Sequence, residues 1–473
     1  MDTFKNVPTA NIVGFGSDGC SVMMGAHDSV ASRMTENFPG VTIMKCICHS
    51  LHLCASEACK QLPRAAEDLV RGIYNHFKAS AKRQAAFAEF QKFFDLDVHK
   101  ILRPSQTRWL SMMAVVERTL EQWDALHLFF RDQVLSARLT SAEWILDTLR
   151  RPFIKAYLLF VQWILPKFTS MNEFFQSEKT IITVLHERMC QAYEELLLLY
   201  PGAYWPVRPW LYLKEAYVHR RPLSEVDPTA AEGFTPLEHL FLGVKVRNWL
   251  ETPACAAHPK LVEDFKIRCR NFMITGCQEL RKRYDFGNFV LKALGWLSPA
   301  TAMSRQDRPP SILQLARAMP RCVAQDDETL ERLEEEWRKF PSLNIPAMRN
   351  QELIKAPDQF WHEMSMATDA CGEHYFKVLP AFALSALAVP HSNASCERDF
   401  SKINNVKTKI RNRLVTPTVR AVVLSSQSMR RGPADQCCHS WSPAKEMRSR
   451  MTAATIYRTA TNELDVDDLT FHD

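Results

Sequence analysis

A stretch of about three hundred residues, 63–375, carries apolar residues at helical spacing and shows no strand-like alternation. The helical spacing is clearest in 110–130, 141–176 and 327–340. Glycine is scarce, with 14 residues in the whole chain against 26 prolines. Few glycines and many prolines favour long helices that end at proline over a glycine-punctuated α/β enzyme. The chain is therefore predicted to be mainly α-helical.

A strand-and-helix pattern precedes this helical stretch. Residues 10–16 (ANIVGFG) form a short apolar run of β type that ends at a turn signature, and a helix is predicted over 21–35. Residues 41–48 (VTIMKCIC) are a second predicted strand, and a helix over 49–61 follows. The order strand, helix, strand, helix is typical of an α/β sheet, so a partial sheet is expected near the start.

Helical signals return after residue 375. An apolar helix (YFKVLPAFALSALAV) is stopped by Pro390, and a Ser/Asn-rich helix start follows at 391–395. Thr416 and Pro417 are a good N-cap and first-turn pair for one more helix. A small α/β piece, a long helical block and a final helical piece indicate one domain that is split by an insertion.

This pattern predicts four segments. Residues 1–62 and 376–428 are expected to be the two parts of the split domain, and 63–375 the helical insertion. Residues 429–473 are expected to be a disordered tail.

Cysteine use and apolar length indicate a soluble, intracellular protein. The 14 cysteines lie in a large chain whose opening residues (MDTFKNVPTA) show no apolar secretion signal, so they are expected to be reduced. The longest apolar stretches, such as 156–165, have about ten residues, half of what a bilayer span needs. No membrane partner is therefore expected.

Net charge is only +6, so a basic partner surface has to be local. The segment 398–420 carries seven Lys and Arg residues against one acid, Asp399. A basic run of this kind is more often a solvated helix face than a nucleic-acid site. Both interpretations stay open on charge alone.

Six potential zinc ligands lie within residues 45–60 (KCICHSLHLCASEACK). A structural zinc site usually has two ligand pairs with a loop between them, whereas these six residues form one continuous cluster with no second ligand pair beyond a loop. On a strand, Cys46 and Cys48 would point to the same side. Buried thiols that pack as small apolar groups are therefore favoured, and zinc is kept as the alternative. The six are Cys46, Cys48, His49, His52, Cys54 and Cys59.

The spacing of Cys46 and His49 before an apolar helix resembles a motif of the hAT transposase superfamily, where it follows the last core strand. Two further stretches are similar to that family. NIVGFGSDGCSVMMG (11–25) resembles the strand-then-Asp-Gly segment of the second catalytic aspartate, matched by Asp18. SQTRWLS resembles the Arg-Trp motif, matched by Arg108 and Trp109.

Two later stretches extend the resemblance in the same order. LPKFTSMNEFFQSEK (165–179) resembles a helical segment of the family's insertion domain. LAVPHSNASCERDFSKINNVKTKIRNRL (387–414) resembles the C-terminal signature, with Glu397 at the catalytic glutamate and Arg411 to Leu414 entering the dimerisation region. The resemblance implies an RNase H-like core that is split by the helical insertion.

The family's chemistry needs three carboxylates around two divalent ions, Mg²⁺ or Mn²⁺. The resemblance implies that Asp18 and Glu397 are two of these catalytic and metal-binding acids. Its first aspartate lies on an upstream strand, and three strands need roughly twenty residues before residue 10. Only nine are present, so we expect an incomplete triad and no catalysis. Apart from the resemblance, Asp18 fits a helix cap and Glu397 a surface ion pair.

The resemblance also implies DNA contacts. Trp109 would stack on a base turned out of the helix, with Arg108 on a neighbouring phosphate, although Trp109 also fits a helix core. Basic residues after the acid-bearing helix could follow a DNA backbone without reading its sequence. These basic residues are Lys407, Lys409, Arg411 and Arg413.

The sequence therefore leads to three functional hypotheses. The first is a catalytically inactive, nuclear, transposase-derived protein that dimerises through 376–428 and keeps nonspecific DNA affinity. The second is a fragment of an active DNA transposase whose first aspartate and zinc finger are missing. The third is a helical interaction scaffold without DNA contact. The nuclear location rests on the resemblance alone.

Overall fold

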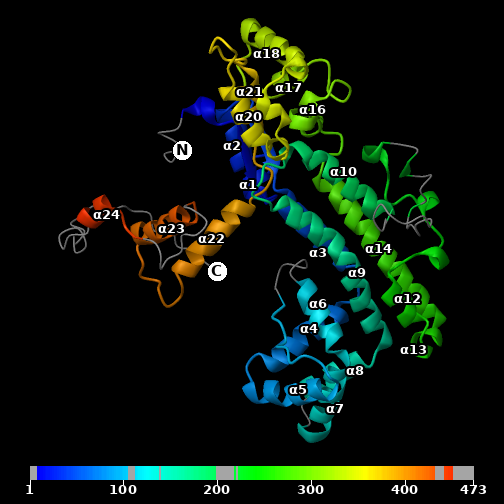
Figure 1. Cartoon of the computed structure of the whole chain (residues 1–473). Coiled ribbons are helices and arrows are strands. Elements are labelled where there is room, and N and C mark those ends of the chain that lie inside the picture. The colour runs from blue at the N-terminus through cyan, green and yellow to red at the C-terminus, as the bar shows by residue number, and fades with distance from the viewer. Residues whose placement is uncertain are drawn as a thin grey trace. The chain divides into compact units, whose positions relative to one another are not determined.

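The structure is a computed structural model, and two compact units make up the chain, Met1–Ser395 and Cys396–Asp473. The ribbon is shown in Figure 1. Each unit is described by itself. The residues that the structure describes are 8–104, 112–137, 140–198, 213, 218–219, 222–431 and 442–450.

The small sheet of the first unit has two parallel strands, β1 (Gly14–Ser17) and β2 (Thr42–Lys45). Gly14 lies opposite Thr42, and Ser17 lies opposite Lys45. The predicted pair of strands is confirmed, and both are shorter than expected. In particular, β2 ends at Lys45, so Cys46 and Cys48 lie beyond the strand and not on one side of it.

The helix predicted over 21–35 is two helices, α1 (Ser21–Met24) and α2 (Val30–Asn37). The chain turns between them at Asp28, whose φ of +48° is a left-handed value that a helix does not contain. The spacing of apolar residues does not reveal this turn, because it records only which face of a segment is buried. Aspartate is one of the few residues that tolerate a left-handed backbone conformation.

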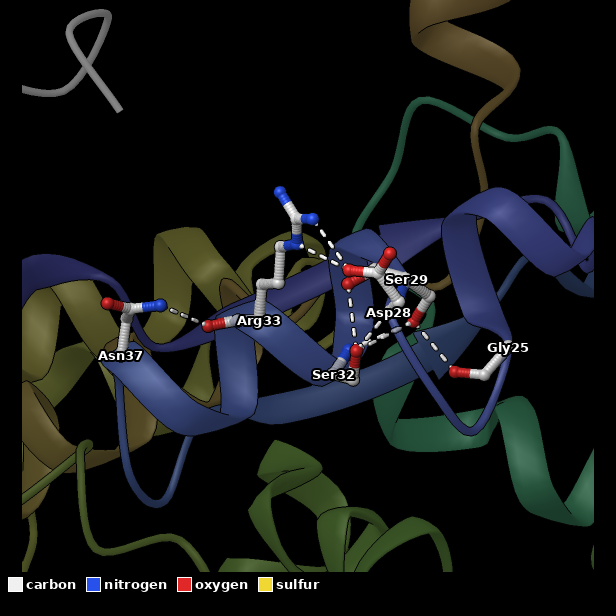
Figure 2. Close-up of polar contacts among 6 residues, drawn as sticks. All are labelled: Gly25, Asp28, Ser29, Ser32, Arg33 and Asn37. Atoms are coloured by element: carbon white, nitrogen blue, oxygen red, sulfur yellow. Dashed lines mark hydrogen bonds and ion pairs between the residues drawn. The ribbon is translucent and has the colours of Figure 1, made fainter.

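Side chains around the turn start α2, as Figure 2 shows. The Ser29 hydroxyl accepts a hydrogen bond from the Ser32 backbone N–H at 3.0 Å, and the Ser32 hydroxyl accepts from the Ser29 N–H at 2.9 Å. Ser29 also donates to the Gly25 carbonyl at 2.7 Å, and Arg33 pairs with Asp28 at 2.6 Å. This reciprocal cap satisfies backbone donors that the first turn leaves unpaired.

Helices make up most of the remaining described structure. Between residues 63 and 375 the described residues contain no strand, which confirms the mainly helical fold. The helix that was expected over 49–61 is present and begins two residues earlier, at Ile47. The helices of the first unit that follow β2 in the described residues are α3 (Ile47–Cys59), α4 (Arg64–Phe77), α5 (Ala81–Phe93), α6 (Met113–Glu121), α7 (Trp123–Ala137), α8 (Thr140–Leu149), α9 (Pro152–Phe175), α10 (Ile182–Leu198), α12 (Val244–Leu250), α13 (Pro253–Ala256), α14 (Pro259–Arg283), α15 (Phe289–Ala293), α16 (Pro299–Met303), α17 (Leu313–Ala318), α18 (Asp327–Lys339), α19 (Gln351–Ile354), α20 (Pro357–Met366) and α21 (Leu379–Leu387).

The final helices are α22 (Ala394–Val406), which spans the boundary between the units, then α23 (Thr416–Arg431) and α24 (Lys445–Arg450). The predicted start at Thr416 is confirmed. Helical structure is also described in part of the segment for which we predict disorder. None of the helices in the described ranges is both long and apolar enough to cross a membrane.

Helix α3 lies at the centre of the first unit, where it packs against α14 and α9 (Figure 1). Its inner face is fully buried at Leu51, Cys54 and Ala58. A Cβ atom added to Gly276 of α14 would lie 3.3 Å from the Phe168 ring and 3.7 Å from Ala58. Small residues on both helices therefore let α14 approach α3 closely.

Arg321, in the loop between α17 and α18, fastens the helical part to the start of the sheet. Its guanidinium donates to the Ile12 carbonyl at 2.5 Å, to the Pro39 carbonyl at 3.2 Å and to the Thr9 carbonyl. The same group lies 5.9 Å from the centre of the Phe38 ring. One side chain thus satisfies backbone carbonyls in the segment that leads into β1 and in the segment that leads into β2.

Candidate functional site

The C-terminal ends of β1 and β2 meet a segment that comes from far along the chain, 389–393. A Cβ atom added to Gly16 would lie 2.9 Å from the Pro390 side chain, and one added to Gly14 would lie 3.0 Å from it. Only glycine lets Pro390 approach β1 this closely. The chain that follows α21 therefore packs directly on the first strand.

Cys46 joins three parts of this site. Its backbone N–H donates to the Ser17 carbonyl at 2.7 Å, which extends the pairing with β1 by one residue. Its Sγ accepts from the backbone N–H of His49 at 3.5 Å and caps α3. The same Sγ accepts from the backbone N–H of Asn393 at 3.2 Å. Next to it, the Ile47 N–H donates to the His391 carbonyl at 3.3 Å.

Sequence reasoning identified Cys46 and His49 as a motif but missed Pro390 and Asn393. Both lie in the quoted C-terminal stretch, yet no spacing pairs Asn393 with a cysteine 347 residues earlier. The glycines at 14 and 16 were the available signal, because alternate glycines in a strand often mark close approach of another backbone.

Asp18 is half-exposed and follows β1 directly. Its carboxylate accepts a hydrogen bond from the Cys20 N–H at 3.2 Å, which is a local turn contact just before α1. Hydrogen bonding by Cys20 holds the pKa of Asp18 below its ordinary value, partial burial opposes this, and the charge of His49 lowers the pKa further. The lowered pKa favours an ionised Asp18 carboxylate at the end of the strand.

The cysteines of the 45–60 cluster are buried. Cys46 is 2% exposed, and Cys48, Cys54 and Cys59 also lie in the core. Burial raises the pKa of the Cys54 thiol to about 12 and raises that of Cys59 well above its ordinary value. Protonated thiols of this kind pack as small apolar groups, the arrangement that the sequence favours.

Glu397 lies in the first turn of α22 and is exposed. It belongs to the second unit, whereas Asp18 belongs to the first. In the ranges that the structure describes, no three His, Cys, Asp or Glu side chains gather closely enough to hold a metal ion. Arg108 and Trp109 lie outside the described residues.

The predicted basic residues lie in the connection between α22 and α23. The side chains of Lys407, Lys409, Arg411 and Arg413 are exposed. Among the residues described here, they form no ion pair. Asp399, the one acid of the run, is bound to Lys402 at 2.6 Å. The connection is therefore an uncompensated positive surface.

The second unit also exposes apolar side chains. Ile410 is 95% exposed and Phe400 is 57% exposed, whereas Val419 is buried. Val415 is 61% exposed, Leu424 is 51% exposed and Val422 is 45% exposed. Large apolar side chains that are exposed on one short segment are typical of surfaces that partners cover.

No protein-family model matches the chain.

Proposed function

We propose that the protein is a catalytically inactive, hAT transposase-derived protein that forms a homodimer through its second unit and binds DNA without sequence preference. The observation that carries this proposal is the group of exposed apolar side chains on α22 and α23, among them Phe400, Val422 and Leu424. Apolar side chains that are exposed on one short segment could be covered by the same segment of a second copy, as in a twofold dimer.

The contact between the end of α21 and β1 supports the split-core part of the proposal. A core that is interrupted by an insertion needs its later segment to return to the early strands, and the bond from the Asn393 N–H to Cys46 Sγ is a contact of that type. Dimerisation needs only a surface, so it does not depend on a complete set of catalytic acids.

DNA binding is assigned to the positive connection between α22 and α23. Its four exposed cations have no acidic partner in the described residues and are free to contact phosphates. Contacts of this type neutralise the backbone and release counterions, so they are salt-dependent and carry no sequence information.

The dimer is tested by charging its proposed surface. The double substitution Ile410→Glu and Leu424→Glu is expected to weaken self-association by about 100-fold, because apolar anchors at an interface typically contribute about 1–2 kcal/mol or more each. Light scattering during size-exclusion chromatography measures the mass. Val244→Glu with Leu261→Glu, at exposed apolar positions of the first unit, is the matched control and should stay dimeric. A monomeric wild-type chain would contradict the proposal.

The DNA assignment is tested by neutralising Lys407, Lys409, Arg411 and Arg413 together to glutamine. Affinity for unrelated duplexes should fall by a similar factor, and the slope of log affinity against log salt should fall by about 0.9 for each phosphate that the variant no longer neutralises. Fluorescence anisotropy over a salt series measures both. Glutamine at four exposed cations of the first unit, Lys60, Lys92, Lys245 and Lys260, is the control. Unchanged affinity in the first variant would favour the scaffold hypothesis.

A further inference from the structure

A cavity of about 310 Å³ opens on the first unit beside α4. Four of its lining residues recur at positions i, i+3, i+4 and i+7 and therefore share one face of the helix and its C-cap. The other two come from the segment that leads towards α6. The lining residues are Arg71, Tyr74, Asn75, Lys78, Arg103 and Pro104.

The cavity is positively charged, because three of its six lining residues are cations and none is an acid. Arg71 pairs with Glu67 at 2.7 Å, which offsets one charge. Lys78 Nζ donates to Asn75 Oδ1 at 2.9 Å and keeps its full charge. Arg103 is exposed and forms no hydrogen bond or ion pair in the described part of the chain. Two positive charges thus remain for an anionic ligand.

The C-terminus of α4 would by itself repel an anion, since its last carbonyls carry partial negative charge. Side chains from α5 reduce this effect. Arg83 donates to the His76 carbonyl at 3.0 Å, and Gln84 donates to the Phe77 carbonyl at 3.1 Å. The helix end beside Lys78 is therefore partly neutralised, and Arg83 adds another positive charge close by.

Tyr74 indicates which anion fits the cavity. Its ring is half-buried in the wall, and its hydroxyl forms no hydrogen bond in the described residues. A free phosphate needs cations and donors but no aromatic surface. A nucleic-acid strand needs both, because its bases stack on aromatic rings while cations contact its backbone. The side-chain amide of Asn75 adds a neutral hydrogen-bond donor and acceptor to the cavity wall.

We propose that this cavity binds a single-stranded nucleic acid, with Lys78 and Arg103 on backbone phosphates and Tyr74 stacked on a base. The site lies in the first unit and is additional to the basic connection between α22 and α23. It does not depend on dimerisation.

The test measures binding of a fluorescent single-stranded oligonucleotide to the full chain whose Lys407, Lys409, Arg411 and Arg413 are glutamine, so that the basic connection no longer contributes. Adding Lys78→Gln with Arg103→Gln should weaken this binding about tenfold and lower the salt slope by about 0.7 for each phosphate left without its cation. Adding Tyr74→Leu instead should weaken it about tenfold with little change in the salt slope. Lys60→Gln with Arg64→Gln, two exposed cations outside the cavity, is the matched control.

Equal affinity of the cavity variants and the control would overturn the inference, as would no detectable oligonucleotide binding in the background chain. Inorganic phosphate is added as a competitor at the same phosphate concentration. Displacement of the oligonucleotide by it would identify a site for a free anion and would also overturn the nucleic-acid assignment. Light scattering on the same samples reports the dimer separately, so a failure here is distinguishable from a failure of the proposed function.

Discussion

Replacing Glu336 with alanine is expected to lower the free energy of unfolding of the first unit by about 3–5 kcal/mol. This carboxylate lies on α18 and is only 9% exposed. It accepts hydrogen bonds from three successive backbone N–H groups, those of Lys377 at 2.7 Å, Val378 at 3.1 Å and Leu379 at 2.7 Å. These donors lie at the start of α21, and alanine would leave them without an acceptor.

The effect should reach the candidate site, because α21 leads directly to Pro390. Phe382, Ala383 and Ala386 of this helix are fully buried, so a loosened start disturbs the core that holds the 389–393 segment on β1. Hydrogen exchange at the backbone N–H of Asn393 should therefore become faster in the Glu336 variant.

Urea denaturation followed by circular dichroism measures the change in stability. Glu336→Gln keeps one acceptor oxygen and should fall between alanine and the wild type. Glu335→Ala removes an exposed neighbouring carboxylate, 3.8 Å from Lys339, and should change stability by less than about 0.5 kcal/mol. Equal stability of the Glu336→Ala and Glu335→Ala variants would contradict the prediction that the three hydrogen bonds to Glu336 stabilise the first unit.

The second large effect is acid destabilisation through His76. This imidazole is 5% exposed, and neither ring nitrogen has a hydrogen-bond partner in the described residues. Aromatic rings surround it, with the Phe77 and Phe130 centres at 5.2 and 4.9 Å. Burial, and then the nearby charge of Arg83, lower the pKa of His76 from 6.5 to about 4.

The sign follows from proton binding. The unfolded chain binds a proton at His76 near pH 6.5, whereas the folded chain does so only near pH 4. The contribution of neutral His76 to the free energy of unfolding is therefore fully present above pH 6.5 and is lost as the pH falls towards 4. The full loss is on the order of 3 kcal/mol, and about 2 kcal/mol of it should be visible at pH 5.

Urea denaturation at pH 7.5 and pH 5 tests this prediction. His76→Leu removes the titrating group and keeps an apolar side chain of similar size, so about 2 kcal/mol of the pH effect should disappear. His258→Leu, at an exposed position, is the control and should keep the wild-type pH dependence. An identical loss of stability at pH 5 in the His76 variant and the wild type would contradict the assignment.

Local sequence patterns predicted the two strands, the helical character of residues 63–375 and the start of α23, but not the break at Asp28. Apolar spacing reports which face of a segment is buried and carries no information about one left-handed residue. The candidate site was predicted less completely. Asp18, Cys46 and His49 were identified, while Pro390 and Asn393, which hold the later segment against β1 and Cys46, were not.

The sequence by itself determined the helical character of the protein and the order of its elements, because helix caps, turns and periodic burial depend on residues a few positions apart. Only the tertiary structure decided which distant groups meet. Asn393 reaches Cys46 across 347 residues, Arg321 reaches Ile12 across 309, and Glu336 caps a helix that begins 43 residues later. Such contacts satisfy backbone groups that become buried only when the elements pack together, so no local pattern records them.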